Sequence, residues 1–570
     1  MMKKFHLTNS YTLINFDVFS CDTEVDIIES KAFAKVLDKF IKKLWQEKSP
    51  LLSNLTKEDT KLFLDMYKML LVYEPKMISE TSESFRFVNK NKTALYEITE
   101  QFYDYWRKLE RFGLLQARQD ANQNARKLDL IHKAEVFNEK VLTLYRTITQ
   151  KLLGDHYKIY RQLPAGVNAN LLYINHSFST DKVVENIQNI GFITGIVTRP
   201  PFIIYSESNK REGLFKEIHF NPLPELSINK LHYFTFPIKV GTVLAFIYVH
   251  RDLLHLGIGL ANLFEFASFN EFNNTKPDVV YIFGIREKEY DGTYHYDKEQ
   301  DIYFGFVDRS QKNDYFGYLK KMILTLHNIY QLDNGNLPVH GGMVQITLNN
   351  DEVRNIVIVG DSGAGKSETL EALRVIGSKK IKKITVVFDD MGTLKLRNNA
   401  VIATGTEIGA FVRLDDLDSG YAYQEMERAI FLNPHRKNAR LIIPLTMYKE
   451  VIKEYKVDFF LYANNYDKTQ KGVKVFTNTG EALDVFKAGK RYAKGTTSEV
   501  GLVSSYFANP FGPVQREKQT EKLLEQYFKA LNNTKVIIGE LFTKLAQPGY
   551  ETKGPQEAAE QLLKYITKQN

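Results

Sequence analysis

Residues 355–368 carry the pattern that most constrains what this chain can fold into. They read Asn-Ile-Val-Ile-Val-Gly-Asp-Ser-Gly-Ala-Gly-Lys-Ser-Glu, an apolar run followed by glycines and then by the start of a helical pattern. The run matches G-x-x-x-x-G-K-[ST] in the context of strand, turn and helix that this motif requires. Glycines let backbone N–H groups curve around a polyphosphate, and the helix N-terminus adds its positive end. The sequence therefore predicts a P-loop that binds a nucleotide.

The side chains of this turn have predicted roles. Lys366 is expected to reach the β- and γ-phosphates, and the hydroxyl of Ser367 is expected to hold Mg²⁺. A glycine turn without a ligand is the alternative reading. The predicted nucleotide-binding set consists of Gly360, Asp361, Ser362, Gly363, Ala364, Gly365, Lys366, Ser367, Glu368 and Asp389.

Two adjacent carboxylates follow the next strand-like run. Residues 384–388 are apolar or β-branched, and Asp389 and Asp390 come directly after them. P-loop proteins use an acidic group at a neighbouring strand end to hold Mg²⁺. Two adjacent acids can serve two metals, or one metal and one proton, and the pattern leaves these alternatives open.

Further candidate residues precede the P-loop. His340 stands just before the strand that leads into the glycine turn, where a histidine can act as a metal ligand as well as fill a structural position. Tyr315, Lys320 and Lys321 lie at the start of a helical pattern. Taken alone, a lysine pair of this kind most often indicates a solvated helix face.

The composition excludes several classes of protein. The single cysteine, Cys21, can form neither an intrachain disulfide nor a thiolate metal site. The 76 Lys and Arg against 68 Asp and Glu give a net charge of +8, a mild excess that by itself suits anionic metabolites as well as nucleic acid. The longest apolar run, 240–249, is about half of a bilayer span, and no apolar segment follows the N-terminal lysines. We expect a cytoplasmic protein with no membrane or nucleic-acid partner.

The chain changes character along its length, which predicts three regions. Residues 1–160 form a helical N-terminal region, 161–310 a mixed α/β domain, and 311–570 an α/β domain that holds the P-loop. The basic stretch 107–126 is interpreted as a solvated helix face, with a nucleic-acid face as the alternative. We expect the N-terminal region to be a packing or interaction region, and a protein partner could bind there.

Local patterns give the expected elements. Apolar residues at three- and four-residue spacing predict helices over 31–45, 60–73, 134–153, 368–376, 421–431 and 515–531. Short runs rich in β-branched and aromatic residues predict strands over 192–197, 202–205, 232–240, 242–249, 279–283, 302–307, 354–359, 383–388, 440–444 and 458–462.

Several motifs occur together in the order found in one family. They are Lys276-Pro277-Asp278-Val-Val, Tyr315-x-Gly-x-x-Lys320-Lys321, His340-Gly, G-D-S-G-x-G-K-S-E, a strand ending in Asp389-Asp390, Gly409-Ala-Phe-Val-Arg-Leu, Asn438-Ala-Arg440-Leu-Ile-Ile-Pro444, and Phe486-Lys-Ala-Gly489 with Gly495-Thr496. From about residue 165 to 565 the chain resembles the ATP-dependent phosphoenolpyruvate carboxykinases, within the superfamily that also contains the HPr kinases. The resemblance implies a carboxykinase-like mixed α/β fold with a C-terminal P-loop nucleotide-binding domain.

The resemblance implies two metal sites. Lys321, His340 and Asp390 would form a transition-metal site that holds Mn²⁺, in which a neutral lysine is an unusual ligand favoured by the adjacent cation. Mg-ATP would be bound by Lys366, Ser367 and Asp389, of which Ser367 and Asp389 would be the Mg²⁺ ligands.

The resemblance also implies roles toward the substrate. Arg440 would neutralise charge on the transferred phosphoryl group, and Lys320 and Tyr315 would face the organic substrate. The run Thr194-Gly-Ile-Val-Thr-Arg199 is similar to the family's TGIFTGRSPKD loop, so Arg199 would bind the substrate carboxylate. The implied catalytic set is therefore Lys366, Arg440, Lys320, Arg199, Asp390 and Tyr315.

The chain departs from the family pattern on the substrate side. After Arg199 it reads Pro-Pro-Phe-Ile-Ile where the family has Ser-Pro-Lys-Asp, and Tyr318 replaces a glutamate. The P-loop ends in Lys-Ser-Glu, as in HPr kinases, instead of Lys-Thr-Thr. The first 160 residues have no evident counterpart in the family.

Three functions follow as hypotheses. The first is decarboxylation of oxaloacetate and phosphorylation of the enolate by ATP to give phosphoenolpyruvate, ADP and CO₂, which needs no general base. The second is an HPr-kinase-like transfer of the γ-phosphate to a hydroxyl of a small molecule or protein, with Asp390 or Asp389 as the base. The third is a non-catalytic ATP-binding scaffold.

Overall fold

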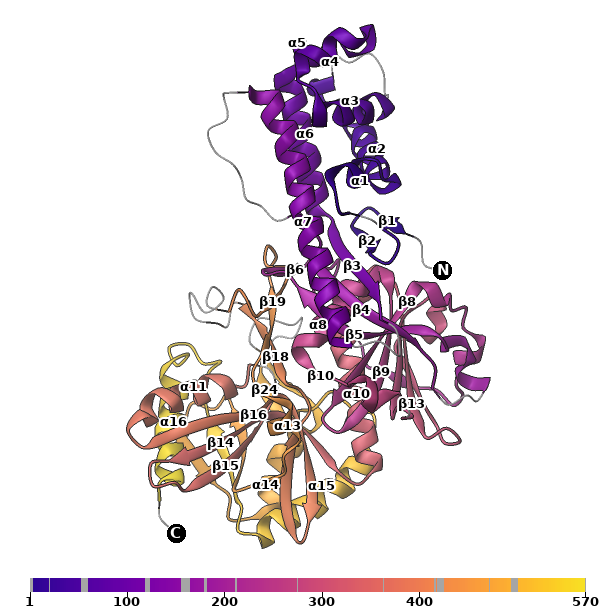
Figure 1. Ribbon diagram of the computed structural model, residues 1–570. Coiled ribbons are helices and arrows are strands. Elements are labelled where there is room, and N and C mark those ends of the chain that lie inside the picture. Colours follow the sequence, from indigo (N-terminus) through magenta and orange to yellow (C-terminus); the bar gives the residue numbers. More distant parts are fainter. Residues whose placement is uncertain are drawn as a thin grey trace. The chain divides into compact units, whose positions relative to one another are not determined.

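A computed structural model of the 570-residue chain describes residues 4–19, 21–52, 60–117, 123–154, 165–178, 182–210, 213–273, 275–361, 363–414, 417, 425–470, 472–493 and 501–568 (Figure 1). The protein is mixed α/β, with several sheets and many helices. It divides into two compact units. The first comprises Met1–Asn175 and Ile193–Phe202, and the second comprises His176–Phe192 and Ile203–Asn570.

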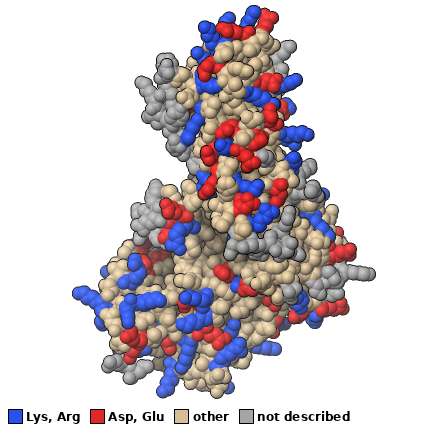
Figure 2. Space-filling model, in the orientation of Figure 1, with Lys and Arg blue, Asp and Glu red and all other residues tan. Residues whose placement is uncertain are grey.

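The first unit is built mainly from helices. Its longer helices are α2 (Lys31–Gln46), α3 (Thr60–Val72), α6 (Lys92–Lys108) and α7 (Gln123–Leu153). Helices α2, α3 and α7 confirm the predicted helices over 31–45, 60–73 and 134–153, whereas α6 was not predicted. Helix α2 begins after Ser30, whose hydroxyl accepts a hydrogen bond from the N–H of Phe33, and it buries one apolar stripe. On the visible face of this unit, acidic and basic side chains are interspersed (Figure 2).

The interpretation of 107–126 as a helix face is wrong for its central part. Residues Glu110–Gln116 form strand β3, which pairs in parallel with β2 (Tyr11–Asn15) on one side and with β4 (Ala169–His176) on the other. Both faces of β3 are buried, as expected for a central parallel strand, so its sequence lacks the alternation that indicates a strand. Residues 118–122 lie outside the described part of the chain.

The second unit contains two large sheets. In one of them β8 (Tyr233–Val240) and β9 (Val243–His250) form a hairpin, and β9, β11 (Val279–Ile285) and β13 (Ile302–Asp308) run parallel to one another. These strands coincide with predicted ones. Helix α10 (Phe316–Asp333) contacts both β11 and β13.

The other sheet carries the glycine turn. Its order is β21-β17-β16-β14-β15-β22-β26-β23, with bounds β14 (Leu337–Leu348), β15 (Val353–Val359), β16 (Ile381–Arg397), β17 (Ala400–Gly405), β21 (Tyr455–Lys456), β22 (Phe459–Asn464), β23 (Gly472–Val475) and β26 (Ile537–Phe542). One apolar cluster packs this sheet against α14 (Thr479–Ala488) and α15 (Glu517–Asn533). A second cluster packs it against α11 (Lys366–Ile376) and α16 (Lys553–Ile566). The predicted helices 368–376 and 515–531 are confirmed.

The predicted helix over 421–431 is wrong in the part that the structure describes, since residues 425–428 form turns. Residues Ile430–Leu432 form strand β19, which pairs antiparallel with β20 (Arg440–Pro444), itself paired with β18 (Gly409–Arg413). Residues 421–424 lie outside the described part. Apolar residues in so short a run fit either element, and pairing with β20 decides in favour of a strand.

The division into units differs from the three predicted regions. No boundary falls at 310, because α10 packs on β11 and β13 and also on β14 of the other sheet. A boundary falls inside strand β5 (Ile190–Thr198), so the segment that ends in Arg199 groups with the N-terminal residues. Among the described residues, no helix is both long and apolar enough to cross a membrane.

Candidate functional site

The glycine turn lies between β15 and α11, as predicted. Its glycines adopt conformations that other residues avoid: φ is +78° at Gly363 and +91° at Gly365. Gly365 also packs closely on Thr543, because a Cβ atom there would lie 2.5 Å from Thr543 Oγ1. The Thr543 hydroxyl donates to the carbonyl of Ala364 at 2.6 Å. The turn is therefore a tight backbone concavity at the start of a helix, a geometry suited to a phosphate.

The side chains of the turn lie at different depths. Lys366 is buried, and its Nζ donates to the carbonyls of Gly360 at 2.6 Å and Asp361 at 3.1 Å. Ser367 is exposed at the second position of α11, and Glu368 is half-buried. Ser362 lies outside the described residues.

Asp389 and Asp390 lie on β16, which is separated by β14 from β15, the strand that precedes the turn. In the antiparallel pairing with β14, Asp389 is opposite Gly342 and Asp390 is opposite Gly341. Asp390 has a φ of +125°, which is strained for a residue with a side chain. Burial raises the pKa of Asp389 above its usual value, and the charge of Lys366 is the largest opposing influence. The turn, Lys366 and Asp389 thus fit a Mg²⁺-polyphosphate.

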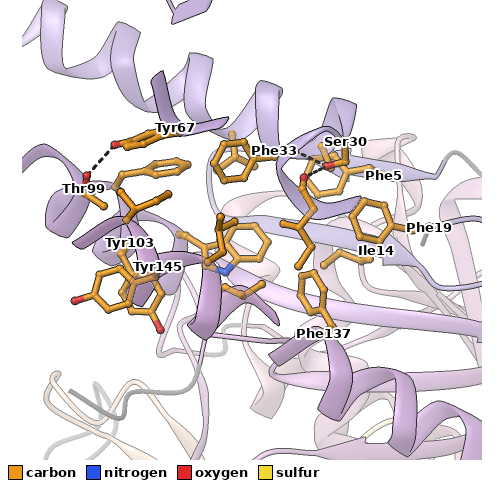
Figure 3. A pocket seen from close by; sticks show the side chains of 18 residues that line it. Phe5, Ile14, Phe19, Ser30, Phe33, Tyr67, Thr99, Tyr103, Phe137 and Tyr145 are labelled. Atoms are coloured by element: carbon orange, nitrogen blue, oxygen red, sulfur yellow. Dashed lines mark hydrogen bonds between the residues drawn. The ribbon is translucent and has the colours of Figure 1, made fainter. Parts of the chain in front are cut away.

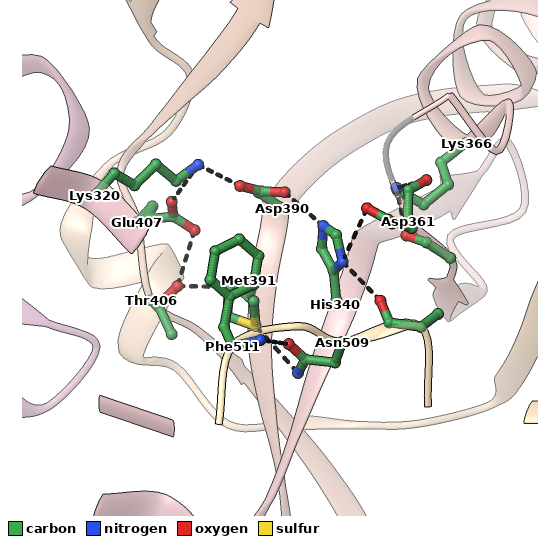
Figure 4. Close-up of polar contacts among 12 residues, drawn as sticks. Lys320, His340, Asp361, Lys366, Asp390, Met391, Thr406, Glu407, Asn509 and Phe511 are labelled. Carbon is green, nitrogen blue, oxygen red and sulfur yellow. Dashed lines mark hydrogen bonds and ion pairs between the residues drawn. The ribbon is translucent and has the colours of Figure 1, made fainter. Parts of the chain in front are cut away.

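Asp390 joins a chain of buried polar side chains (Figure 4). Its Oδ1 lies 2.9 Å from His340 Nε2, and its Oδ2 accepts a short hydrogen bond from Lys320 Nζ. Lys320 Nζ also lies 3.1 Å from Oε1 of Glu407, a side chain with no exposed surface. Lys320 keeps 3% of its side-chain surface exposed, whereas Asp390 keeps 29%. Asp390 is therefore the member that a substrate can reach.

The hydrogen bonds of His340 define where its protons lie. Nδ1 is 2.8 Å from the carbonyl oxygen of Ala508, which can only accept, so Nδ1 carries a proton. Nε2 faces Asp390 Oδ1 at 2.9 Å, within hydrogen-bond distance.

The charged side chains of this cluster shift one another's pKa values. Burial would raise the pKa of Asp390, but Lys320 and His340 outweigh it and hold that pKa well below its usual range. Burial would lower the pKa of Lys320, and Asp390 and Glu407 together raise it. Burial raises the pKa of Glu407 to about 7, despite the opposing charge of Lys320. The pair that stays charged is therefore Lys320 and Asp390.

Asp361 connects this cluster to the glycine turn. It is buried, accepts from Arg491 Nε at 2.8 Å, and lies 3.6 Å from His340 Nδ1. The backbone carbonyl of His340 accepts from the N–H of Gly360 at 3.0 Å. The side chains that hold Asp390 and the backbone of the turn are thus parts of one hydrogen-bonded assembly.

The remaining predicted residues have diverse positions. Lys321 is buried, donates to the carbonyl of Gly213 at 2.5 Å and lies over the ring of Phe215. Tyr315 is the N-cap residue of α10, and the Arg440 guanidinium lies 5.4 Å from the ring centre of Phe411. Arg199 belongs to the first unit, where its N–H donates to the carbonyl of Asn168 at 2.9 Å. The structure thus brings Lys320, and not Lys321, to Asp390.

Two members of the cluster were missed in the sequence. Glu407 follows the apolar strand β17, so the signal used for Asp389 and Asp390, an acid at a strand end, was also available there. Arg491, in β24 (Lys490–Tyr492), lies among ordinary basic residues and gives no such signal.

Glu407→Gln should change how stability depends on pH. Because the folded state raises the Glu407 pKa from 4.5 to about 7, it binds more protons than the unfolded state between these values, and stability falls as pH rises through that window. Glutamine has no such titration. We expect the free energy of unfolding of the variant, measured with denaturant and compared with that of the parent, to rise by ~2 kcal/mol between about pH 5 and about pH 8. The exposed Glu371→Gln is the control, and an equal pH response in both variants would contradict the assignment.

Comparisons with known proteins add little to this geometry. No family model matches the sequence, and no curated protein matches it. Among solved structures, the HPr(Ser) kinase/phosphatase from Coxiella burnetii aligns over 24% of this chain and 77% of its own, at 14% identity and a TM-score of 0.15. A likeness at that score carries no argument for fold or activity. Among the described residues, no three His, Cys, Asp or Glu side chains are grouped so as to hold a metal ion.

Proposed function

We propose that this protein is an ATP-dependent phosphoryl transferase, and that it acts as a kinase on a hydroxyl group. The observation that carries the proposal is the buried cluster of His340, Asp390 and Lys320 joined to the P-loop through Asp361. It provides a polyphosphate cradle and, beside it, a partly exposed carboxylate that is held ionised. These are the parts that phosphoryl transfer to an alcohol requires.

The residues would have the following roles. The N–H groups of the turn and Lys366 bind the β- and γ-phosphates, after Lys366 exchanges its carbonyl partners for phosphate oxygens. Ser367 and Asp389 would hold Mg²⁺, which supplies neutralisation of phosphate charge when bound. Arg440 is proposed to face the transferred group. Lys320, which is almost fully buried and paired with Asp390 and Glu407, would hold Asp390 in place instead of facing the acceptor as the resemblance implies, and Tyr315 is buried as well.

Asp390 would orient the acceptor. Its carboxylate accepts a hydrogen bond from the hydroxyl, whose oxygen attacks the γ-phosphorus in line. The new O–P bond forms as the bond to the ADP oxygen breaks, and the hydroxyl proton passes to Asp390. A carboxylate whose pKa is held low is a weak base, but a loose transition state needs positioning more than early proton removal.

The contacts of the two lysines support a kinase over a carboxykinase. The carboxykinase resemblance implies Lys321 as a metal ligand with His340 and Asp390. Here Lys321 donates to Gly213, and Lys320 forms the ion pair with Asp390. An ion pair keeps the carboxylate available to a hydroxyl, as a kinase needs.

The carboxykinase remains a second candidate because of one distance. His340 Nε2 and Asp390 Oδ1 face each other at 2.9 Å, and adjacent ligands of a cation with bonds of about 2.1 Å lie about 3 Å apart. These two atoms can therefore share a proton or both bind Mn²⁺. The acceptor would be the enolate left when oxaloacetate loses CO₂, with Arg199 as the proposed carboxylate-binding residue.

One assay separates the candidates. The protein is incubated with ATP, Mg²⁺ and Mn²⁺, with and without oxaloacetate, and phosphoenolpyruvate and ADP are measured together. Stoichiometric phosphoenolpyruvate would establish the carboxykinase and overturn the kinase proposal. ADP formation without phosphoenolpyruvate supports the kinase and directs the search to alcohols and partner proteins. Nucleotide binding without any turnover would favour the scaffold.

His340→Ala tests the metal assignment. If His340 and Asp390 bind Mn²⁺, the variant should lose Mn²⁺ activation while nucleotide affinity changes little, because the P-loop keeps its own phosphate contacts. We expect the Mn²⁺ concentration for half-maximal activity to rise about 10- to 100-fold. The exposed His435→Ala is the control. Unchanged Mn²⁺ dependence in His340→Ala would remove the second metal site from the carboxykinase candidate.

A further inference from the structure

Two polar side chains reach the glycine turn from the ends of neighbouring strands. Strands β15, β22 and β26 lie next to one another and run parallel, so their carboxyl ends meet at one edge of the sheet. The glycine turn follows β15, Asn465 is the first residue after β22, and Thr543 is the first residue after β26. Both side chains form hydrogen bonds with the backbone of the turn.

Asn465 makes three hydrogen bonds with its side-chain amide and has no exposed surface. Its Nδ2 donates to the carbonyls of Gly363 at 2.9 Å and Tyr492 at 3.0 Å, and its Oδ1 accepts from the N–H of Tyr492 at 2.8 Å. An amide offers two donor hydrogens and an acceptor together, which neither a carboxylate nor a hydroxyl does. Asn465 therefore joins the turn to β24, where the neighbouring Arg491 donates to Asp361.

The two side chains fix successive peptide groups of the turn. In a trans peptide the C=O and the N–H point in opposite directions. Because the Thr543 hydroxyl holds the carbonyl of Ala364, the N–H of Gly365 is directed away from Thr543. In the same way, Asn465 holds the carbonyl of Gly363 and directs the N–H of Ala364 to the opposite side.

This restraint matters because the turn contains glycines. Glycine tolerates rotation of the peptide groups that flank it, and such a rotation exchanges an N–H for a C=O. A C=O that faces a phosphate repels it, whereas an N–H attracts it. Donors that hold the carbonyls therefore favour the arrangement in which the N–H groups of the turn remain for an anion, beside those at the start of α11.

We propose that Asn465 and Thr543 are positioning residues, which hold the carbonyls of the glycine turn so that its N–H groups face the phosphates of the nucleotide. This role rests on the proposed function, since it requires that the turn bind a polyphosphate. It extends the site to two residues that lie far from the P-loop motif in the sequence and that act through the backbone of the turn.

Binding of inorganic triphosphate to the full chain with Mg²⁺ tests this role, because the probe has neither base nor ribose. In calorimetric titration, Asn465→Ala should weaken binding about tenfold, since the carbonyl of Gly363 loses its donor. Asn465→Asp should weaken it about 100-fold, because a carboxylate would oppose the carbonyls of Gly363 and Tyr492. Thr543→Val removes only a hydroxyl and should weaken binding about three- to tenfold.

Matched variants separate positioning from a general loss of stability. Asn433 is also fully buried, and its amide bonds the N–H and the carbonyl of Ser206, both at 3.0 Å. Asn433→Asp should leave triphosphate affinity within about twofold of the parent. Thr99→Val is the control for Thr543→Val, because Thr99 is a buried threonine of the first unit, 3.1 Å from Tyr67 Oη (Figure 3). Lower stability alone reduces the fraction of protein that binds, and so the stoichiometry, but not the affinity.

The outcomes distinguish this role from the proposed function. If the parent binds triphosphate and the folded Asn465 and Thr543 variants bind it within about twofold of the parent, the positioning role is overturned and the proposed function stands. Equal losses of affinity in Asn433→Asp and Asn465→Asp would also overturn the role. A parent that binds neither triphosphate nor ATP would overturn both. If Asn465→Asp loses its cooperative unfolding transition, Asn465→Ala and Thr543→Val decide.

Discussion

Lys366→Ala should reduce ATP turnover by at least about 10³-fold. The ammonium group of Lys366 lies within the glycine turn, on the carbonyls of Gly360 and Asp361, where it can move to the phosphates without a change in the backbone. Alanine removes the positive charge that Lys366 is proposed to direct at the β- and γ-phosphates. ADP formation under saturating ATP and Mg²⁺ measures the loss.

The control for this variant is Lys379→Ala, beyond the other end of α11. Lys379 is exposed, and its replacement removes the same charge from the same part of the chain. Its turnover should equal that of the parent. If Lys366→Ala retained more than about a tenth of the parent rate while folded, the P-loop would not be the site of phosphoryl transfer.

Asp390→Asn should lower phosphoryl transfer by about 10²- to 10⁴-fold and leave nucleotide affinity nearly unchanged. The amide keeps the size of the carboxylate but cannot take the hydroxyl proton. The fold should tolerate the change because Lys320 keeps its contact with Glu407. Single-turnover ADP formation and binding of a fluorescent ATP analogue separate the two effects.

The neighbouring Asp389→Asn is the matched comparison. We expect it to weaken Mg-nucleotide binding, because Asp389 is the acid that interacts with Lys366 of the turn. The two adjacent variants should therefore fail in different ways, one in transfer and the other in binding. Equal losses of nucleotide affinity in both variants would mean that the two carboxylates act as one metal site. The role proposed for Asp390 in the kinase would then be rejected.

The elements that hold the site could be predicted because their signals are local. The apolar run, the glycines and the helical start at 355–368 lie within one short stretch, and each residue's preference points to the same strand, turn and helix. The acid pair after the apolar run 384–388 was equally visible, but the prediction that the strand ends there is wrong, because β16 continues past both acids to Arg397. The helices of the N-terminal residues followed from their spacing of apolar residues.

Strand β3 and strand β19 could not be predicted in the same way. Glu110–Gln116 is buried on both faces and so lacks the alternation that indicates a strand, and Ile430–Leu432 is only three residues long. In both segments the choice of strand is made by pairing with residues elsewhere in the chain. Local preference is weak there, and the partner's hydrogen bonds decide.

By itself, the sequence determined the strand, glycine turn and helix around 355–376 and the position of the acid pair in the chain, and it predicted the phosphoryl-transfer chemistry proposed for them. Only the tertiary structure decided which lysine meets Asp390. Successive helix residues point about 100° apart, so the rotation of α10 against the sheet selects Lys320 and directs Lys321 to Gly213. The structure alone also brought in Glu407 and Arg491, because burial of a charge depends on partners that are distant in sequence.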